Sequence, residues 1–102
     1  MAKVARKTVD VVIDFPRAGE AVTGPEYTLR IMAPAAERVE VSIDNAGWEP
    51  CRESLGLWWY DWSGFAPGTR QLRVQALGAD GRILAVAARQ VPVRPAHGHD
   101  AG

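Results

Sequence analysis

Hydrophobic and polar residues alternate along most of this chain with a period of two, which is the pattern of β-strands that bury one face. The clearest case is residues 38–44, where Val39, Val41 and Ile43 face one way and charged or small polar residues face the other. The same alternation predicts further strands at residues 8–14, 26–33, 69–77 and 82–94. No stretch has an amphipathic helical pattern of useful length, so the chain is expected to be all-β.

Turn-forming residues separate these strands. Pro16 is expected to end the first strand because proline lacks the amide that a β-ladder requires. Residues 44–47 and 78–81 have the composition of tight hairpin turns. Residues 48–52 are the expected return strand of the first hairpin, and Pro50 marks that strand as a sheet edge. About seven short strands with turns every eight to twelve residues predict an all-β sandwich.

The densest hydrophobic stretch, residues 57–62, holds three of the four tryptophans. Alternation divides it into two sets, Trp58, Tyr60 and Trp62 on one face and Leu57, Trp59 and Asp61 on the other. The first set is expected to fill the core, since large aromatic residues usually serve packing. Trp59 shares its face with a carboxylate, so it is the ring expected at the surface, either as part of a binding surface or covered by a terminal segment.

Length and composition point to one soluble domain. The 102 residues suffice for a single core, and 47% hydrophobic and 24% charged residues are near the averages for globular proteins. Twelve basic and twelve acidic residues cancel, which argues against a general nucleic-acid or anionic-membrane binder. No apolar run approaches the roughly 18 residues of a membrane span.

The expected organisation is a flexible basic arm at residues 1–7, a β-sandwich at 8–95 and a flexible polar tail at 96–102. The arm is not followed by the continuous apolar segment of a signal peptide, so it is not expected to be one, and a cytoplasmic location is expected. The single cysteine, Cys51, allows no internal disulfide. That is compatible with a reducing compartment.

The sequence offers little catalytic chemistry. No nucleophile lies near a base, and the glycines are scattered singly at turns rather than grouped in a phosphate-binding loop. His97, His99 and Asp100 lie together in the tail, but they supply too few donors for a structural zinc site. Cys51 is expected to be a packed thiol rather than a reactive one. We therefore expect no enzyme activity, no cofactor and no metal.

Several segments together resemble a known family. They are the hairpin at residues 39–50, the aromatic strand at 58–62, and the segments 67–76 and 80–82. Over residues 9–94 the chain resembles bacterial immunoglobulin-like domains of the early-set type, and among them the C-terminal dimerisation domain of sulfite-oxidase-type molybdenum enzymes. The resemblance implies an immunoglobulin-like β-sandwich of about seven antiparallel strands. The chain departs from the family pattern in two ways. The sequence does not contain the large catalytic domain that precedes this module in the molybdenum enzymes. Position 59, which usually holds a small or polar residue in that family, is a tryptophan here.

Two functional hypotheses follow. The first is a non-catalytic interaction or assembly module, in which Trp59 and Trp48 anchor a protein partner or a second copy of the chain. Asp61 and the outward-facing arginines are expected to assist, namely Arg30, Arg52, Arg70 and Arg73. The alternative is a carbohydrate-binding module, in which exposed Trp48 and Trp59 stack on sugar rings and Asp61 binds a sugar hydroxyl. Neither hypothesis involves nucleic acid or a membrane.

Overall fold

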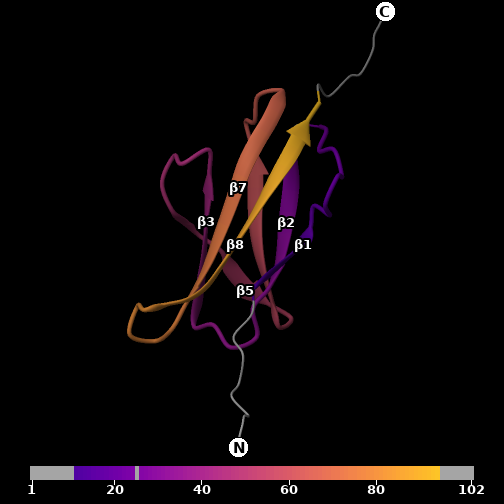
Figure 1. The fold of residues 1–102 in the computed structure, drawn as a ribbon. Helices are drawn as coiled ribbons and strands as arrows, with labels where there is room; N and C mark the ends of the chain where they lie inside the picture. Colours follow the sequence, from indigo (N-terminus) through magenta and orange to yellow (C-terminus); the bar gives the residue numbers. More distant parts are fainter. Residues whose placement is uncertain (1–10, 25, 95–102) are drawn as a thin grey trace, which may run out of the picture.

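The computed structural model describes residues 11–24 and 26–94, and within these ranges all regular structure is β-strand (Figure 1). The strands are β1 (Val12–Phe15), β2 (Glu26–Met32), β3 (Arg38–Ile43), β4 (Glu49–Pro50), β5 (Arg52–Ser54), β6 (Leu57–Ser63), β7 (Gly68–Leu77) and β8 (Ile83–Val93). The expected arm at residues 1–7 and tail at 96–102, with His97, His99 and Asp100, lie outside the described residues. No helix long and apolar enough to cross a membrane is found in the described part of the chain.

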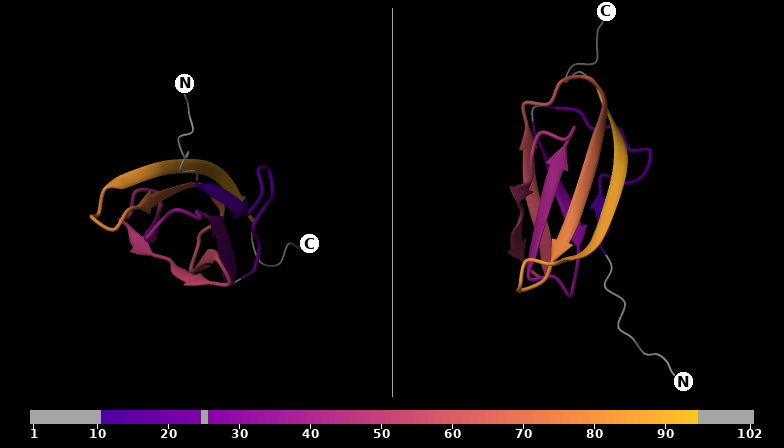
Figure 2. Two further views of the ribbon diagram at one scale, coloured as in Figure 1. Left: turned by 90° about the horizontal axis from the view of Figure 1, so that it is seen from below. Right: turned by 60° about the vertical axis from the view of Figure 1, so that its left-hand side comes forward.

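The strands form two antiparallel sheets that face each other (Figure 2). Sheet A has the order β1-β2-β6-β5, and sheet B has the order β4-β3-β7-β8. The alternation predicts this arrangement because each strand has one apolar face to bury, and two such faces close around one core. The all-β, immunoglobulin-like sandwich is confirmed, with eight strands in place of about seven.

The core lies between the sheets and is built from the residues that alternation assigns to it. Leu29, Ile31, Val39, Val41, Leu72 and Val74 are fully or almost fully buried. Trp58 and Trp62 are 6% and 5% exposed, as expected for their face of β6. Tyr60 points to the same side but is only half-buried, because it lies beside an opening between the sheets.

The return strand expected at residues 48–52 is divided between the two sheets. β4 pairs with β3 at the edge of sheet B, as Pro50 indicates, and the Cys51 amide donates to the Val39 carbonyl at 2.8 Å. The chain then crosses to sheet A, where β5 pairs with β6. Residues 53–54 are therefore part of a strand, and the turn is confined to Leu55 and Gly56 with φ angles of 58° and 76°. Two consecutive positive φ angles are those of a two-residue hairpin loop.

Candidate interaction surface

The register of sheet A places two aromatic rings and two arginines in one row across all four strands. Phe15 on β1 lies opposite Arg30 on β2, Arg30 lies opposite Trp59 on β6, and Trp59 lies opposite Arg52 on β5. Trp59 and Arg52 are thus neighbours on the outer face, as the alternation of β6 predicts. Directly opposed side chains on one sheet face are close enough to interact, so the row forms a continuous strip.

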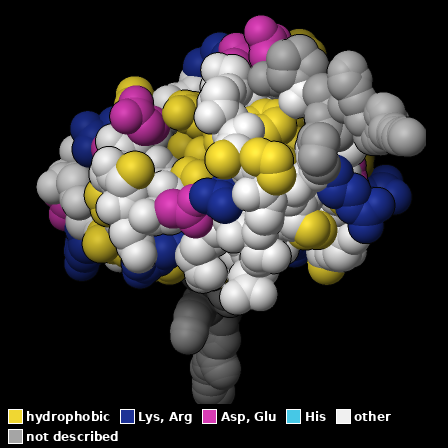
Figure 3. All heavy atoms as spheres, turned by 90° about the horizontal axis from the view of Figure 1, so that it is seen from above, with side chains coloured by type: hydrophobic (Ala, Val, Ile, Leu, Met, Phe, Trp, Pro, Cys, Tyr) yellow, Lys and Arg dark blue, Asp and Glu magenta, His cyan; other side chains and the backbone are white. Residues whose placement is uncertain are grey.

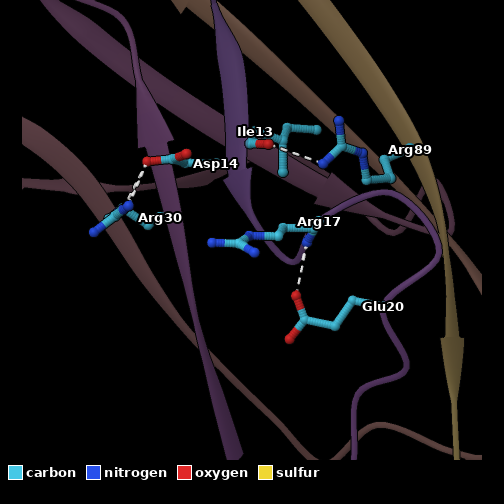
Figure 4. A network of polar contacts seen from close by, with 6 residues as sticks. All are labelled: Ile13, Asp14, Arg17, Glu20, Arg30 and Arg89. Atoms are coloured by element: carbon cyan, nitrogen blue, oxygen red, sulfur yellow. Dashed lines mark hydrogen bonds and ion pairs between the residues drawn. The ribbon is translucent and has the colours of Figure 1, made fainter.

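Arg30 is held in place at the β1 end of the row. Its guanidinium contacts Asp14 Oδ2 through Nε at 2.8 Å and Nη2 at 2.7 Å, and lies 4.4 Å from the centroid of the Phe15 ring. Arg17 lies 5.1 Å from the same centroid. Strict alternation would send Asp14 and Phe15 to opposite faces, but the register shifts between Ile13 and Phe15, and a bulge lets both reach Arg30. Figure 4 shows the Asp14–Arg30 pair.

Figure 4 also shows two contacts that brace the chain next to this pair. The backbone amide of Arg17 donates to Glu20 Oε1 at 2.8 Å, which closes a turn at residues 17–20. Arg89 Nη1 reaches from β8 to the Ile13 carbonyl at 2.9 Å. The end of β1 that presents Phe15 is therefore fixed from both sides.

Trp59 and Arg52 are fixed by a second group of hydrogen bonds. Trp59 is half-buried, and its indole Nε1 donates to the Ser54 carbonyl at 2.9 Å. Arg52 donates to both carboxylate oxygens of Asp61, at 2.9 and 3.4 Å, and Thr28 Oγ1 donates to Oδ1 at 3.0 Å. The hydrogen bonds from Arg52, and then from Thr28, hold the pKa of Asp61 below its ordinary value. Asp61 is therefore a stable carboxylate that orients Arg52 beside the indole.

Apolar side chains border the row at the β5–β6 hairpin end. Val12 and Met32 lie opposite each other and both are exposed, and Leu57 is half-buried on the same face. Leu55 at the hairpin tip is 90% exposed and has a positive φ. Leucine in this backbone region is unfavourable, and an exposed leucine contributes no packing, so stability does not explain it.

We call these side chains together the sheet A patch: Val12, Phe15, Arg30, Met32, Arg52, Leu55, Leu57 and Trp59. Of the seven binding residues predicted from the sequence, the fold brings together Trp59, Arg30, Arg52 and Asp61. Phe15, Met32 and Leu55 were not predicted. The sequence signal that could have identified Leu55 is a leucine directly before glycine in a tight turn, where asparagine or aspartate is usual.

The other predicted residues lie elsewhere. Trp48 is 41% exposed and lies just before β4, outside sheet A. Arg73 is exposed on the outer face of sheet B and donates to Asn45 Oδ1 at 3.0 Å. The prediction that Arg70 points outward is wrong. Arg70 is paired with Val91 on the core side, where it contacts Asp44 Oδ2 at 3.0 Å and lies at the cleft described next.

An open cleft of about 370 Å³ lies between the sheets beside β6. Its apolar wall includes Ile43, Tyr60, Trp62 and Phe65, with the rings of Trp62 and Phe65 centred 4.7 Å apart. Glu49 lies at the same cleft. Burial of Tyr60, followed by the charge of Glu49, raises the pKa of Tyr60. Figure 3 views the molecule from above and shows hydrophobic side chains exposed between acidic and basic groups.

The described residues contain no metal cluster or activated nucleophile. No group of three or more histidine, cysteine, aspartate or glutamate side chains is placed to hold a metal within residues 11–24 and 26–94. Cys51 is half-buried, and burial, followed by the charge of Glu40, raises the pKa of its thiol to about 12. A thiol that keeps its proton is a weak nucleophile.

Comparison with known proteins identifies the fold. No protein-family model matches the chain, and no curated protein matches it in sequence. Among solved structures, the fibronectin(III)-like modules of Clostridium thermocellum CbhA match with a TM-score of 0.68 and 18% identity, over 86% of this chain and 100% of that chain. An endo-β-1,4-mannanase from Thermotoga petrophila matches with a TM-score of 0.73 and 10% identity, over 87% of this chain.

A modular endo-β-1,4-mannanase from Cellulomonas fimi also matches, with a TM-score of 0.54 and 21% identity over 92% of this chain. This chain covers 20% of each mannanase chain and the whole of the CbhA module. At these identities the likeness concerns the fold alone. It confirms the immunoglobulin-like part of the family resemblance, and the fold resembles that of fibronectin(III)-like modules.

Proposed function

We propose that this domain is a non-catalytic interaction module that binds a protein partner through the sheet A patch. The observation that carries the proposal is the row of Phe15, Arg30, Trp59 and Arg52, which is continuous across four strands. Aromatic residues, methionine and arginine are enriched at protein interfaces, and tryptophan and arginine supply much of the binding energy there.

The pairing of charges within the patch favours an interface over a merely solvated sheet face. Asp14 and Asp61 each orient one arginine of the row, so the arginine side chains lose less conformational freedom when a partner binds. The two ion pairs also neutralise the patch. The expected partner therefore presents an apolar surface with a few hydrogen-bond acceptors rather than a strongly charged one.

Leu55 extends this surface beyond the sheet. Its side chain is 90% exposed at the tip of the β5–β6 hairpin, next to the Ser54 carbonyl that holds the Trp59 indole. An exposed leucine at the tip of a hydrogen-bonded hairpin is suited to enter a pocket of a partner. Self-association is a second form of the same proposal, and the resemblance to a dimerisation domain of molybdenum enzymes supports it.

The experiment uses a photo-crosslinking amino acid at Met32, inside the sheet A patch, and in parallel at Arg73 on the opposite face. Both positions are exposed, so they form a matched pair. Incubation with extract of the source organism should yield a crosslinked protein from position 32 and not from position 73. The captured protein is then purified and titrated with the unmodified domain.

Trp59→Ala should weaken that binding by about tenfold or more, as expected for a central tryptophan, whereas Arg73→Ala should leave it unchanged. Equal capture at both positions, or unchanged affinity of Trp59→Ala for the captured protein, would refute the proposed surface.

The cleft favours carbohydrate binding as a second candidate function. It combines the aromatic rings of Tyr60, Trp62 and Phe65 with the carboxylate of Glu49, and Trp48 is exposed next to Glu49 in the chain. Aromatic faces and carboxylates are the groups that bind sugar rings and hydroxyls. Calorimetric titration with β-1,4-linked manno- and cello-oligosaccharides tests it. Binding that is lost in Tyr60→Ala but kept in Trp59→Ala would favour this candidate over the sheet A patch.

A further inference from the structure

β8 forms one edge of sheet B, and in the described part of the chain other segments cover this edge along only one half of the strand. Near its C-terminal end, the Val22 amide donates to the Pro92 carbonyl and the Arg94 amide donates to the Val22 carbonyl, both at 2.9 Å. Arg89 adds a link to the residue that follows β1, since its Nη1 donates to the Pro16 carbonyl at 2.7 Å. This half of the edge is therefore shielded by the chain itself.

The other half, residues 83–88, pairs with β7 on one side and with no described residue on the other. It reads Ile-Leu-Ala-Val-Ala-Ala, without a charge or a proline. Ile83 and Val86 are each 55% exposed. Ala85 and Ala87 pair with core residues of β7 and so face inward, yet they stay half-buried.

Natural proteins usually protect such edges with charges, prolines, bulges or a covering segment. The pairing of β7 with β8 shifts register between Ala76 and Leu77 of β7, opposite the start of β8. Residues 85–88 of β8 pair regularly and carry no charge. Among residues 11–24 and 26–94, the chain thus protects one half of this edge and leaves a strand able to form hydrogen bonds along the other half.

We propose that a second copy of this chain pairs with this half of β8, antiparallel, so that the two B sheets join into one continuous sheet across a two-fold axis. This association lies on a different surface from the sheet A patch and leaves that patch free for a partner. β-strand addition of this kind obtains affinity from backbone hydrogen bonds and specificity from the side chains on either face.

A second copy is favoured because the segment is compatible with itself. In a two-fold antiparallel pair the same segment faces its own copy, so any charge near the axis would lie close to an identical charge. Pairing centred on Val86 puts Val86 opposite its own copy and Ala85 opposite Ala87 of the second copy. A partner selected by charge would need charged groups at this edge, and residues 83–88 have none.

An interface of one short strand from each copy lies at the small end of specific interfaces, so a reversible dimer with a dissociation constant on the order of 10 μM is expected. Sedimentation velocity of the full chain from about 1 to 500 μM, a range chosen to bracket that value, should show a monomer–dimer equilibrium. Val86→Lys and Val86→Glu should each sediment as monomers. An equimolar mixture of the two variants should regain a dimer, because opposite charges then face each other at the axis.

Ala46→Lys is the matched control, since Ala46 is exposed in the turn after β3, outside both the sheet A patch and β8, and this variant should dimerise like the unsubstituted chain. Met32→Lys, within the sheet A patch, tests that patch as the alternative site of self-association. Circular dichroism confirms that each variant is folded. A monomer throughout the concentration range, a dimer that persists in Val86→Lys, or a mixture that stays monomeric would each overturn the proposal. Loss of the dimer in Met32→Lys alone would instead assign self-association to the sheet A patch.

Discussion

The two faces of β6 should differ sharply in what they contribute to stability, and Trp62→Ala against Trp59→Ala measures the difference. Trp62 is 5% exposed and packs against Phe65. Truncating a buried tryptophan to alanine costs about 3–5 kcal/mol. The cleft beside Trp62 opens to solvent, so water can enter part of the space that the ring leaves. We therefore expect a loss near the lower bound, about 3 kcal/mol.

Trp59→Ala should cost much less. The half-buried indole makes one hydrogen bond, to the Ser54 carbonyl, which contributes about 1 kcal/mol net. Its cross-strand contacts with Arg30 and Arg52 add about 0.5 kcal/mol. The expected total is about 1.5 kcal/mol, so the two variants should differ by about 1.5 kcal/mol or more.

Urea unfolding followed by far-ultraviolet circular dichroism measures both variants without relying on tryptophan fluorescence. In thermal melts the difference corresponds to a Tm gap of about 6–12 °C for a domain of this size. Trp48→Ala is the control, because an exposed residue in a loop should change stability by less than about 0.5 kcal/mol. If Trp59→Ala is as damaging as Trp62→Ala, then Trp59 is a core residue and the sheet A patch is not a binding surface.

Three further predictions concern the hairpin tip and the titrating groups. Leu55→Asn should stabilise the domain by about 0.5–1 kcal/mol, because asparagine tolerates the positive φ at this position; a lower urea midpoint would contradict this. Arg52→Ala should raise the pKa of Asp61 toward its ordinary value, and an unchanged NMR titration of its carboxyl carbon would mean that Arg52 does not stabilise the carboxylate. Burial raises the pKa of Cys51 from 9.0 to about 12 and that of Tyr27 from 10.0 to about 12, so the folded chain keeps both protons at pH values where the unfolded chain loses them. Stability should therefore be constant from pH 7 to 9 and fall between about pH 9 and 12, and urea midpoints that do not fall over this range would refute it.

The sequence predicted which residues face the core and which do not. Side chains on a strand alternate strictly, so Trp58 and Trp62 on one face of β6 and Trp59 with Asp61 on the other follow from residue order alone. Local turn chemistry likewise located the hairpins, because the turns after β3 and β7 need residues that accept unusual backbone angles. Alternation and turn chemistry depend only on residues that are close in the sequence, and they suffice to predict the fold class.

The tertiary structure decided which of these strands lie side by side and in what register. Phe15, Arg30, Trp59 and Arg52 form a row only because four strands from separate parts of the chain align, and a shift of one residue in any strand would break it. The crossing to the other sheet at Cys51 and the bulge next to Asp14 also depend on which partner each strand finds. Alternation gives each side chain its face of the sheet, but its neighbours on that face depend on pairing between distant segments.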